Sequence, residues 1–398
     1  MIGASNKVAA DDSFKLGREK MSSEIITFDE ALKSTELVDK LNDMALLSKN
    51  LYRMYGSSDW LKSINRPDNT IFLLLHKSKN SKIDNILPFI NCTKVINLLN
   101  CKLITIGFNL NAAEAIGCEI LGDISEFNYA DIVNYIFDKQ DGIDCIYIKS
   151  ISPETEIYST LIESGKKINS KYFCFIESGP REFHSLSLKE SFEAFLSMYS
   201  KKERYNLKRQ CRLAREASGG ELTLKRIASA DDVEFFVTSS RQILNNSWKS
   251  NLGETDIFFS MDRCSEYSIL AQNGLLRSYI LLGNSEPWAF VLGYQWGGIF
   301  HYSNVAYDES RANLSPGTVL FYLMLEDLHF NNKPEILNFG IGNSFYKRRF
   351  GTEISSDCTL FIARKNIKNK LLAIALNIKN SIKNLYNNIK LTKSTETV

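Results

Sequence analysis

Apolar residues in the first part of the chain recur in two patterns: short runs typical of buried strands, and longer stretches with helical spacing. The N-terminal segment 1–23 is polar and shows neither pattern, so we expect it to be flexible. The strands that the pattern predicts are 23–27, 70–77, 86–95, 101–108, 144–151 and 171–178, and the helices are 29–50, 127–140 and 153–165.

The second part begins with 187–220, which the pattern predicts to be one continuous helix that ends at Gly219-Gly220 and bridges two domains. Three of the later strands are joined by short Gly/Asn turns, which predicts an antiparallel meander. The strands predicted here are 221–227, 275–283, 288–297, 299–307, 335–342 and 357–365, and the helices are 230–248, 256–274, 315–332 and 344–351. The order of elements is similar in both parts, so we expect an α/β protein with mixed sheets that contains two copies of one fold.

A length of 398 residues suits two domains, and 44% apolar with 24% charged residues is a globular composition. The longest unbroken apolar run, Val319–Leu325, is far shorter than the roughly 20 residues of a spanning helix. The N-terminus has no apolar core of a secretory signal. We therefore expect a cytoplasmic protein that is not integral to a membrane.

The eight cysteines are scattered without any CxxC spacing, and several lie in apolar strand-like segments. This arrangement favours buried free thiols in a reducing compartment. With only four isolated histidines, the sequence predicts no metal site.

The formal net charge of +2 conceals two basic segments. Residues Lys201 to Arg226 carry nine Lys/Arg against three Asp/Glu, and Arg364 to Lys393 carry eight Lys/Arg and no acid. The rest of the chain is therefore acidic. This distribution argues against a nucleic-acid binder with a wholly basic face, and favours local anion sites or surface contacts.

Chemistry is concentrated in two places, of which the first is the start of the helix at Ser315, Pro316 and Gly317. Proline suits the first helical position, and glycine leaves the amides of the first turn uncovered. Exposed amides and the helix dipole favour phosphate oxygens, and Arg311 can add a charge-assisted bond. The alternative interpretation is an ordinary capped helix.

The second place is the run 338–351, NFGIGNSFYKRRFG, in which two glycines end a strand before a short helix. This helix presents Tyr346, Lys347, Arg348 and Arg349. The phenol can protonate a leaving thiolate and the cations can bind a phosphate. The alternative interpretation is a turn with a solvated basic face and a packed tyrosine.

Together these segments resemble the GNAT acyl-CoA transferases, with SRANLSPGTVL similar to their pyrophosphate loop and FYKRRFG to their tyrosine element. The run R-x-N-L-K-R-Q-x-R at 204–212, the Asn-Ser-Trp at 246–248 and FGxGxxxYKxxFG resemble, more closely, the Fem-related GNAT-like acyltransferases of bacterial exopolysaccharide and cellulose biosynthesis. The resemblance implies tandem GNAT-like acyl-CoA N-acyltransferase domains with a C-terminal basic amphipathic helix. It divides the chain into a flexible 1–23, a degenerate domain 24–186, an acyltransferase domain 187–365 that includes the bridging helix 187–218, and a helical tail 366–398.

The resemblance also implies roles for individual residues. Ser315, Gly317 and Thr318 would cradle an acyl-CoA pyrophosphate, and Tyr346 would be the general acid. Lys347 or Arg349 would contact a phosphate or the substrate. No motif assigns the general base. His301, on the strand before the cradle, is the first candidate because imidazole titrates near neutrality, and Asp308 is the second; either residue can equally be structural.

The expected reaction is transfer of an acyl group, with acetyl favoured, from CoA to an amino or hydroxyl group of a sugar or cell-envelope precursor, including lipid-linked sugars. One alternative is a Fem-type aminoacyl transferase that uses aminoacyl-tRNA. Another is a non-catalytic scaffold or glycan-binding protein. A basic row of Arg204, Lys208, Arg212 and Arg215 would guide an anionic substrate or is simply a solvated face.

In the tail, apolar residues alternate by four and three positions, which predicts an amphipathic helix. They are Leu371, Ala375, Ile378, Ile382, Leu385 and Ile389. Its lysines lie off this stripe. Three interpretations remain open: packing on its own domain, pairing with a second copy, or peripheral contact with the anionic surface of the inner membrane.

Overall fold

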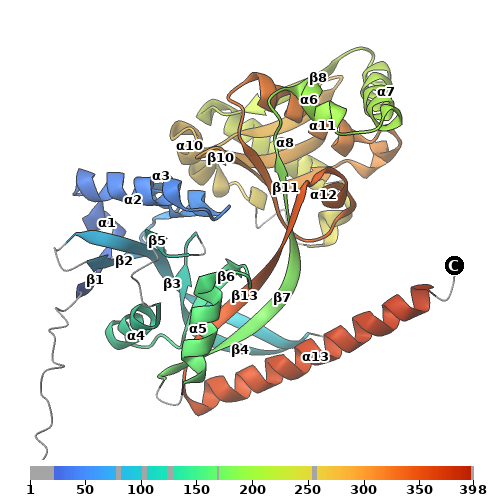
Figure 1. Ribbon diagram of the computed structural model, residues 1–398. Helices are drawn as coiled ribbons and strands as arrows, with labels where there is room; N and C mark the ends of the chain where they lie inside the picture. The colour runs from blue at the N-terminus through green and yellow to red at the C-terminus, as the bar shows by residue number, and fades with distance from the viewer. Residues whose placement is uncertain are drawn as a thin grey trace, which may run out of the picture.

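The computed structural model describes residues 22–77, 82–100, 105–117, 119–122, 129–167, 170–252 and 258–395. Figure 1 shows two lobes joined by two long strands, β7 and β13. The first lobe and its joining strand comprise β1 (Ser22–Thr27), α1 (Phe28–Ala31), α2 (Thr35–Leu47), η1 (Arg53–Gly56), α3 (Ser58–Ile64), β2 (Ile71–Lys77), β3 (Ile83–Asn100), β4 (Thr105–Ala115), β5 (Leu121–Gly122), α4 (Tyr129–Lys139), β6 (Cys145–Ile151), α5 (Glu156–Lys166) and β7 (Tyr172–Ser187).

The second lobe follows, and the chain ends on a long helix. Its elements are α6 (Phe192–Ser197), α7 (Lys201–Ala217), β8 (Leu222–Ile227), η2 (Ala230–Asp232), α8 (Val233–Asn245), η3 (Trp248–Leu252), α10 (Arg263–Gln272), β9 (Ser278–Gly283), β10 (Glu286–Trp296), β11 (Ile299–Tyr307), η4 (Glu309–Leu314), α11 (Pro316–Phe330), β12 (Ile336–Ile341), α12 (Phe345–Phe350), β13 (Glu353–Arg364) and α13 (Ile367–Thr395). No helix in the described ranges is long and apolar enough to cross a membrane.

The described strands form one mixed sheet in the order β1-β2-β3-β4-β6-β13-β7-β12-β11-β10-β9-β8, with β5 beside β3. Its two halves have the same plan. Four antiparallel strands, β1 to β4 or β8 to β11, are followed by a helix and a strand parallel to the fourth, β6 or β12. This repeat confirms the predicted mixed α/β fold, and the pairing of β9, β10 and β11 confirms the antiparallel meander.

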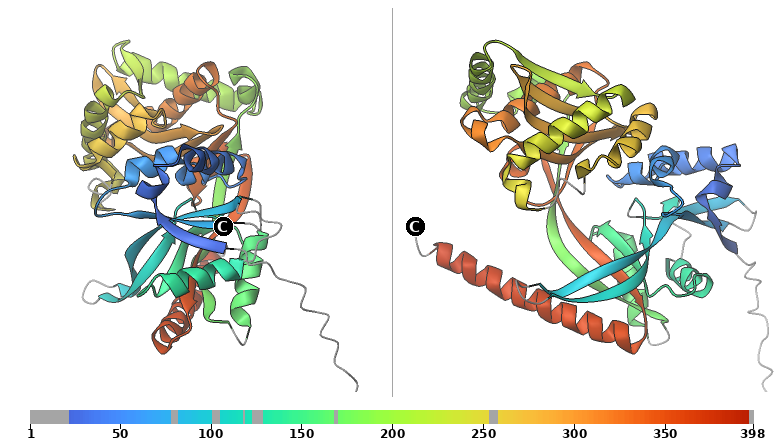
Figure 2. Two further views of the ribbon diagram at one scale, coloured as in Figure 1. Left: turned by 90° about the vertical axis from the view of Figure 1, so that its left-hand side faces the viewer. Right: turned by 180° about the vertical axis from the view of Figure 1, so that it is seen from behind.

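The last strand of each half pairs with the sheet of the other half. β6 is hydrogen-bonded to β13, with Phe361 opposite Tyr147, and β12 is hydrogen-bonded to β7, with Leu337 opposite Leu186. Figure 2 shows the same two strands running between the lobes from both sides. Because each half supplies a strand to its neighbour, the lobes share one hydrogen-bonded sheet.

This exchange bears on the predicted division into 24–186 and 187–365. The boundary lies at the end of β7, a strand that pairs with both lobes. Residues Cys358–Ala363 of β13 pair with β6 and so lie in the sheet of the first lobe. The division remains a prediction, since the sheet is continuous across it; of segment 1–23, only the last residues lie within the described range.

Two of the predicted helices are each interrupted by a polar cap and are not continuous. The segment 187–220 is broken between α6 and α7, where the Ser200 side chain accepts from the Glu203 amide and the Glu203 carboxylate accepts from the Ser200 amide. This reciprocal capping box starts a new helix. Likewise, 29–50 breaks at Ser34, whose hydroxyl caps α2. In both cases a polar cap interrupts an apolar pattern that continues past it.

The core of the second lobe lies on both faces of its sheet. α11, α7 and α6 cover one face, and Val319, Leu320 and Met324 of α11 are fully buried there. α8 and α10 cover the other face. The predicted apolar run in 315–332 is thus a buried core helix, and each such side chain contributes about 1.5–3 kcal/mol of burial free energy.

Candidate active site

A split opens between the parallel strands β11 and β12. They pair only through Ile299–His301 and Ile336–Asn338. Further along, β11 contains a bulge: Asn304 lies opposite Leu292 and Tyr302 opposite Gly293, so Ser303 is an extra residue. A bulge bends and twists its strand. Beyond His301, the backbone groups on the edge of β11 that faces β12 are not paired with β12 in the described part of the sheet.

The N-terminus of α11 follows the end of β11 through the short helix η4. Ser315 adopts a left-handed conformation (φ 52°), and its carbonyl accepts bonds from the amides of Thr318 and Val319. The Gly317 amide has no acceptor among the described residues. A Cβ at Gly317 would lie 3.4 Å from the ring of Tyr307, an ordinary contact distance. The predicted helix start is confirmed, and its free amide with the helix dipole favours an anion.

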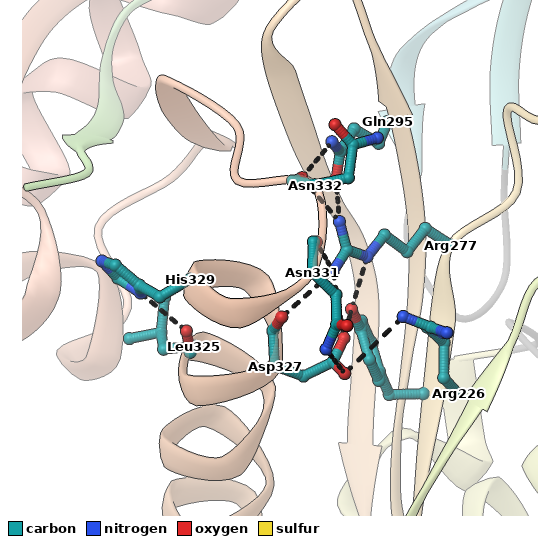
Figure 3. Close-up of polar contacts among 9 residues, drawn as sticks. Arg226, Arg277, Gln295, Leu325, Asp327, His329, Asn331 and Asn332 are labelled. Atoms are coloured by element: carbon teal, nitrogen blue, oxygen red, sulfur yellow. Dashed lines mark hydrogen bonds and ion pairs between the residues drawn. The ribbon is translucent and has the colours of Figure 1, made fainter. Parts of the chain in front are cut away.

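The opposite end of α11 is held by a buried arginine (Figure 3). Arg277 is 7% exposed and donates to the carbonyl oxygens of Asp327, Asn331 and Asn332 at 3.3, 2.6 and 2.9 Å. It also donates to the Asp327 carboxylate and to the Tyr279 hydroxyl. A cation among the last carbonyls complements the dipole of the helix. This network fixes the orientation of α11 relative to β9 and β10.

Helix α12 places Tyr346 and Lys347 beside the split. The Tyr346 ring packs 5.8 Å from Tyr302 and 5.9 Å from Phe339, between centroids, and burial raises the pKa of its phenol. Lys347 is 9% exposed, and its Nζ donates at 2.6 Å to the carbonyl of Ile341, the last residue of β12. Burial, with a smaller effect of Lys249, lowers the pKa of Lys347 to about 8.

Lys249 is a functional candidate that the sequence interpretation missed. Its Nζ donates at 3.0 Å to the side-chain oxygen of Asn304, just beyond the bulge of β11. Lys249 and Lys347 thus lie at the two diverging strands, close enough for the charge of Lys249 to lower the pKa of Lys347. A signal was available, because Lys249 directly follows the Asn-Ser-Trp at 246–248.

The sequence motif at 204–212 lies beside the helix start as well. Gln210 of α7 donates to the Ser315 hydroxyl at 3.4 Å. Within the predicted basic row, Arg212 pairs with Glu216 at 2.6 Å and Arg204 donates to the carbonyl of Tyr199. The structure therefore joins two motifs that are about a hundred residues apart.

His301 lies on the other face of the sheet from Tyr346. Side chains alternate along a strand, and Tyr302 faces Tyr346. The His301 ring instead lies 5.5 Å from that of Tyr55 and 6.4 Å from that of Tyr52, both in the first lobe. Burial, with a smaller effect of Arg53, lowers the pKa of His301 to about 3, so its ring is neutral. The structure does not bring His301 together with the predicted acid.

Three other predicted residues have structural contacts. The Asp308 carboxylate accepts from the amide and hydroxyl of Ser310 at 3.0 and 2.8 Å and forms an ion pair with Arg311 at 3.6 Å. The Arg311 guanidinium lies 4.9 Å from the ring centroid of Trp288. These contacts shape the loop before α11. Arg349 lies 5.0 Å from the ring of Phe350 in the same way.

A cavity of about 1170 Å³ lies in the first lobe against the joining strands. It is lined by Tyr52, by Phe183 of β7, and by Ser355–Asp357 of β13. Two of its carboxyl groups have raised pKa values, Glu119 and Asp357, chiefly because of burial. Sequence reasoning missed this cavity because it depends on the exchanged strands.

Tyr52, which lines this cavity, also lies against β12. A Cβ at Gly340 of β12 would lie 3.4 Å from the Tyr52 hydroxyl. The side-chain amide of Asn338, also in β12, donates to the carbonyl of Leu51 at 3.2 Å. The segment that lines the cavity therefore contacts the strand that forms one side of the split.

A comparison with known protein families matches the region that contains the split and the start of α11. Residues 201–348 match the family described as acetyltransferase (GNAT) domain, a region that runs from α7 into α12. This region is thus a GNAT-type acyltransferase domain. No curated protein sequence matches the chain.

Solved structures with low sequence identity align with most of the chain. The crystal structure of FemX is 10% identical, with a TM-score of 0.55, and the match covers 84% of this chain and 98% of FemX. A tandem GNAT protein from the clavulanic acid biosynthesis pathway is 9% identical (TM-score 0.47; 87% and 99% covered). L-PGS from Bacillus licheniformis is 14% identical (TM-score 0.47; 87% and 96% covered). The predicted tandem GNAT-like fold is confirmed; the narrower resemblance to exopolysaccharide enzymes stays a prediction.

Proposed function

We propose that the second lobe transfers an acetyl group from acetyl-CoA to an amino or hydroxyl group of a sugar or cell-envelope precursor, such as one used in exopolysaccharide synthesis. The observation that carries the proposal is the split between β11 and β12, which ends at the uncovered start of α11. The match to an acetyltransferase domain supports acyl transfer in general. The class of acceptor is inferred only from the resemblance of the sequence motifs to enzymes of exopolysaccharide synthesis. Because acyl-CoA is made in the cytoplasm, the reaction takes place there.

In this proposal the donor lies along the split. Its pyrophosphate accepts from the Gly317 amide and from the hydroxyls of Ser315 and Thr318. The thioester carbonyl lies beside the bulged edge of β11, where a backbone amide can stabilise the developing oxyanion. Lys249, whose Nζ bonds to Asn304 just beyond the bulge, adds positive charge at the same place.

The reaction requires one proton acceptor and one proton donor. The acceptor nitrogen or oxygen attacks the thioester carbon, the C–S bond breaks, and Tyr346 gives its proton to the departing thiolate. Neutral Lys347 takes the proton of the acceptor and then returns one to the Tyr346 phenolate, so the protons balance. The lowered pKa of about 8 supports Lys347 as the base more than the buried His301.

The cavity of the first lobe is the proposed route for the acceptor. Its lining includes carboxyl groups, Glu119 among them, that would accept hydrogen bonds from the hydroxyl and amino donors that sugars carry. Tyr52 links this cavity to β12 beside the split. The acceptor would thus approach from the first lobe while the donor occupies the second.

Calorimetry and thermal melting with acetyl-CoA test the proposal. We expect saturable binding, a raised melting temperature and release of free thiol when amino sugars are supplied. Binding without turnover on any acceptor would favour a scaffold. Absence of acetyl-CoA binding, together with transfer from aminoacyl-tRNA, would replace the proposed donor with the aminoacyl alternative.

A further inference from the structure

The C-terminal helix α13 has two apolar faces. One face packs on the sheet of the first lobe, where Asn369, Leu372, Ala373 and Leu376 are buried with Phe361. The helix therefore packs on its own chain, but on the sheet of the first lobe and not on the second lobe. The predicted stripe, however, is not the face that packs.

The second face carries a row of large apolar side chains that are open to solvent, at positions one helical turn apart. They are Ile367 (78% exposed), Leu371 (59%), Ile374 (57%), Ile378 (57%) and Ile382 (62%). At 100° per residue this row lies opposite the buried face. In Figure 1 no other labelled element lies along α13 on the side away from the first lobe, and the second lobe lies at the other end of β7 and β13. The side chains of Leu385 and Ile389 lie outside the described part.

Charge distinguishes between the possible partners of this row. Residues 366–395 contain six lysines and no acidic residue. Lys370 lies on one flank of the row, and Lys368 and Lys379 on the other. Lys368 already pairs with Asp144 of the first lobe at 3.1 Å, and α13 itself carries no carboxylate. A second copy of α13 would bring basic flanks against basic flanks, whereas anionic lipid head groups complement these flanks while the apolar row enters the acyl region.

We propose that the exposed face of α13 binds the surface of an anionic membrane, with Ile374 and Ile378 at the centre of the inserted row. The helix would lie in the plane of the interface, since its other face stays packed on the first lobe. The inference does not depend on the acyl-transfer reaction.

Co-sedimentation of the full chain with vesicles tests the proposal. Truncation is unsuitable, because Leu372 and Leu376 cover the sheet. The chain should sediment with phosphatidylglycerol vesicles but not with phosphatidylcholine vesicles, and should dissociate at high salt. The double substitution Ile374→Gln with Ile378→Gln should weaken binding by about tenfold or more. The control Asn377→Gln, exposed but off the row, should bind as the unaltered chain does.

Circular dichroism and melting establish that each variant keeps α13 folded. If the double variant binds anionic vesicles as tightly as the unaltered chain, the row does not insert and the proposal fails. Equal binding to both lipids also overturns it. Analytical ultracentrifugation tests the remaining outcome, a dimer. If the unaltered chain is a dimer that does not bind vesicles, and the double variant is a monomer, this face binds a second copy and the proposal fails.

Discussion

The two halves of the sheet have the same plan but end differently where the parallel strands meet. In the first lobe, β4 pairs with β6 through Ala112–Glu114 and ends at Ala115. In the second lobe, β11 continues past its last paired residue, His301, to Tyr307. In the described part of the sheet the split therefore opens only in the second lobe, where β11 continues beyond the residues that pair with β12. The two halves share one plan, but among the described strands only the second has this opening between its parallel strands.

The helices that follow these strands differ in charge as well. α4 has Asp131 in its first turn, whereas α11 has no acidic residue there and begins with Pro316 and Gly317. A carboxylate at a helix start opposes a bound anion, so only α11 suits a phosphate. The next helices diverge further, because α12 presents Lys347 to the split while α5 borders the cavity at Glu156 and Ile157. In the proposed reaction the second lobe therefore binds the donor and the first lobe the polar acceptor.

Giving α11 the acidic start that α4 has is the strongest test of this comparison. In Gly317→Glu the new carboxylate lies at the proposed pyrophosphate site, and we expect acetyl-CoA affinity to fall about a hundredfold or more, measured by calorimetry. Gly317→Ala is the matched control, since its Cβ meets Tyr307 at an ordinary contact distance of 3.4 Å. Unchanged affinity in the glutamate variant would place the donor elsewhere.

Removing the acid of the second lobe should affect turnover rather than binding. Tyr346→Phe keeps the ring packed against Tyr302 and Phe339 but lacks the phenolic proton. We expect kcat to fall by about 10²–10⁴-fold with little change in acetyl-CoA affinity. Wild-type turnover, in conditions where the chemical step limits the rate, would mean that the tyrosine only packs.

These tests address residues that local sequence signals could identify. The start of α11 was predictable because proline and glycine act on their own backbone, and α12 because glycines border it. The faces of the sheet that the other lobe covers were not predictable: His301 is buried by Tyr52 and Tyr55, more than two hundred residues away. Nor was the exchange of β7 and β13, since the same apolar strand pattern suits either pairing.

The pH dependence of the reaction tests the role of Lys347. Because its folded pKa is about 8, the amine becomes neutral as pH rises through that value. We expect kcat/KM to rise up to about tenfold per pH unit below pH 8 and then level off. Lys347→Arg keeps the charge but cannot lose its proton near neutrality, so the rise should be absent. A variant with the same profile as the wild type would assign the titration to another group.

The smallest expected effect is a loss of folding stability at low pH, caused by His301 where the two lobes meet. Its pKa is about 3 when folded and 6.5 in the reference state, so between these values the unfolded chain binds the additional proton. Stability is therefore lost as pH falls below 6.5, by roughly 2 kcal/mol between pH 7 and pH 5. His301→Phe keeps an aromatic ring against Tyr52 and Tyr55 but cannot titrate. Urea denaturation of both proteins at the two pH values should show this part of the acid sensitivity only in the wild type. Parallel losses in both would mean that His301 is protonated in the folded protein and that the lobes are not sealed around it.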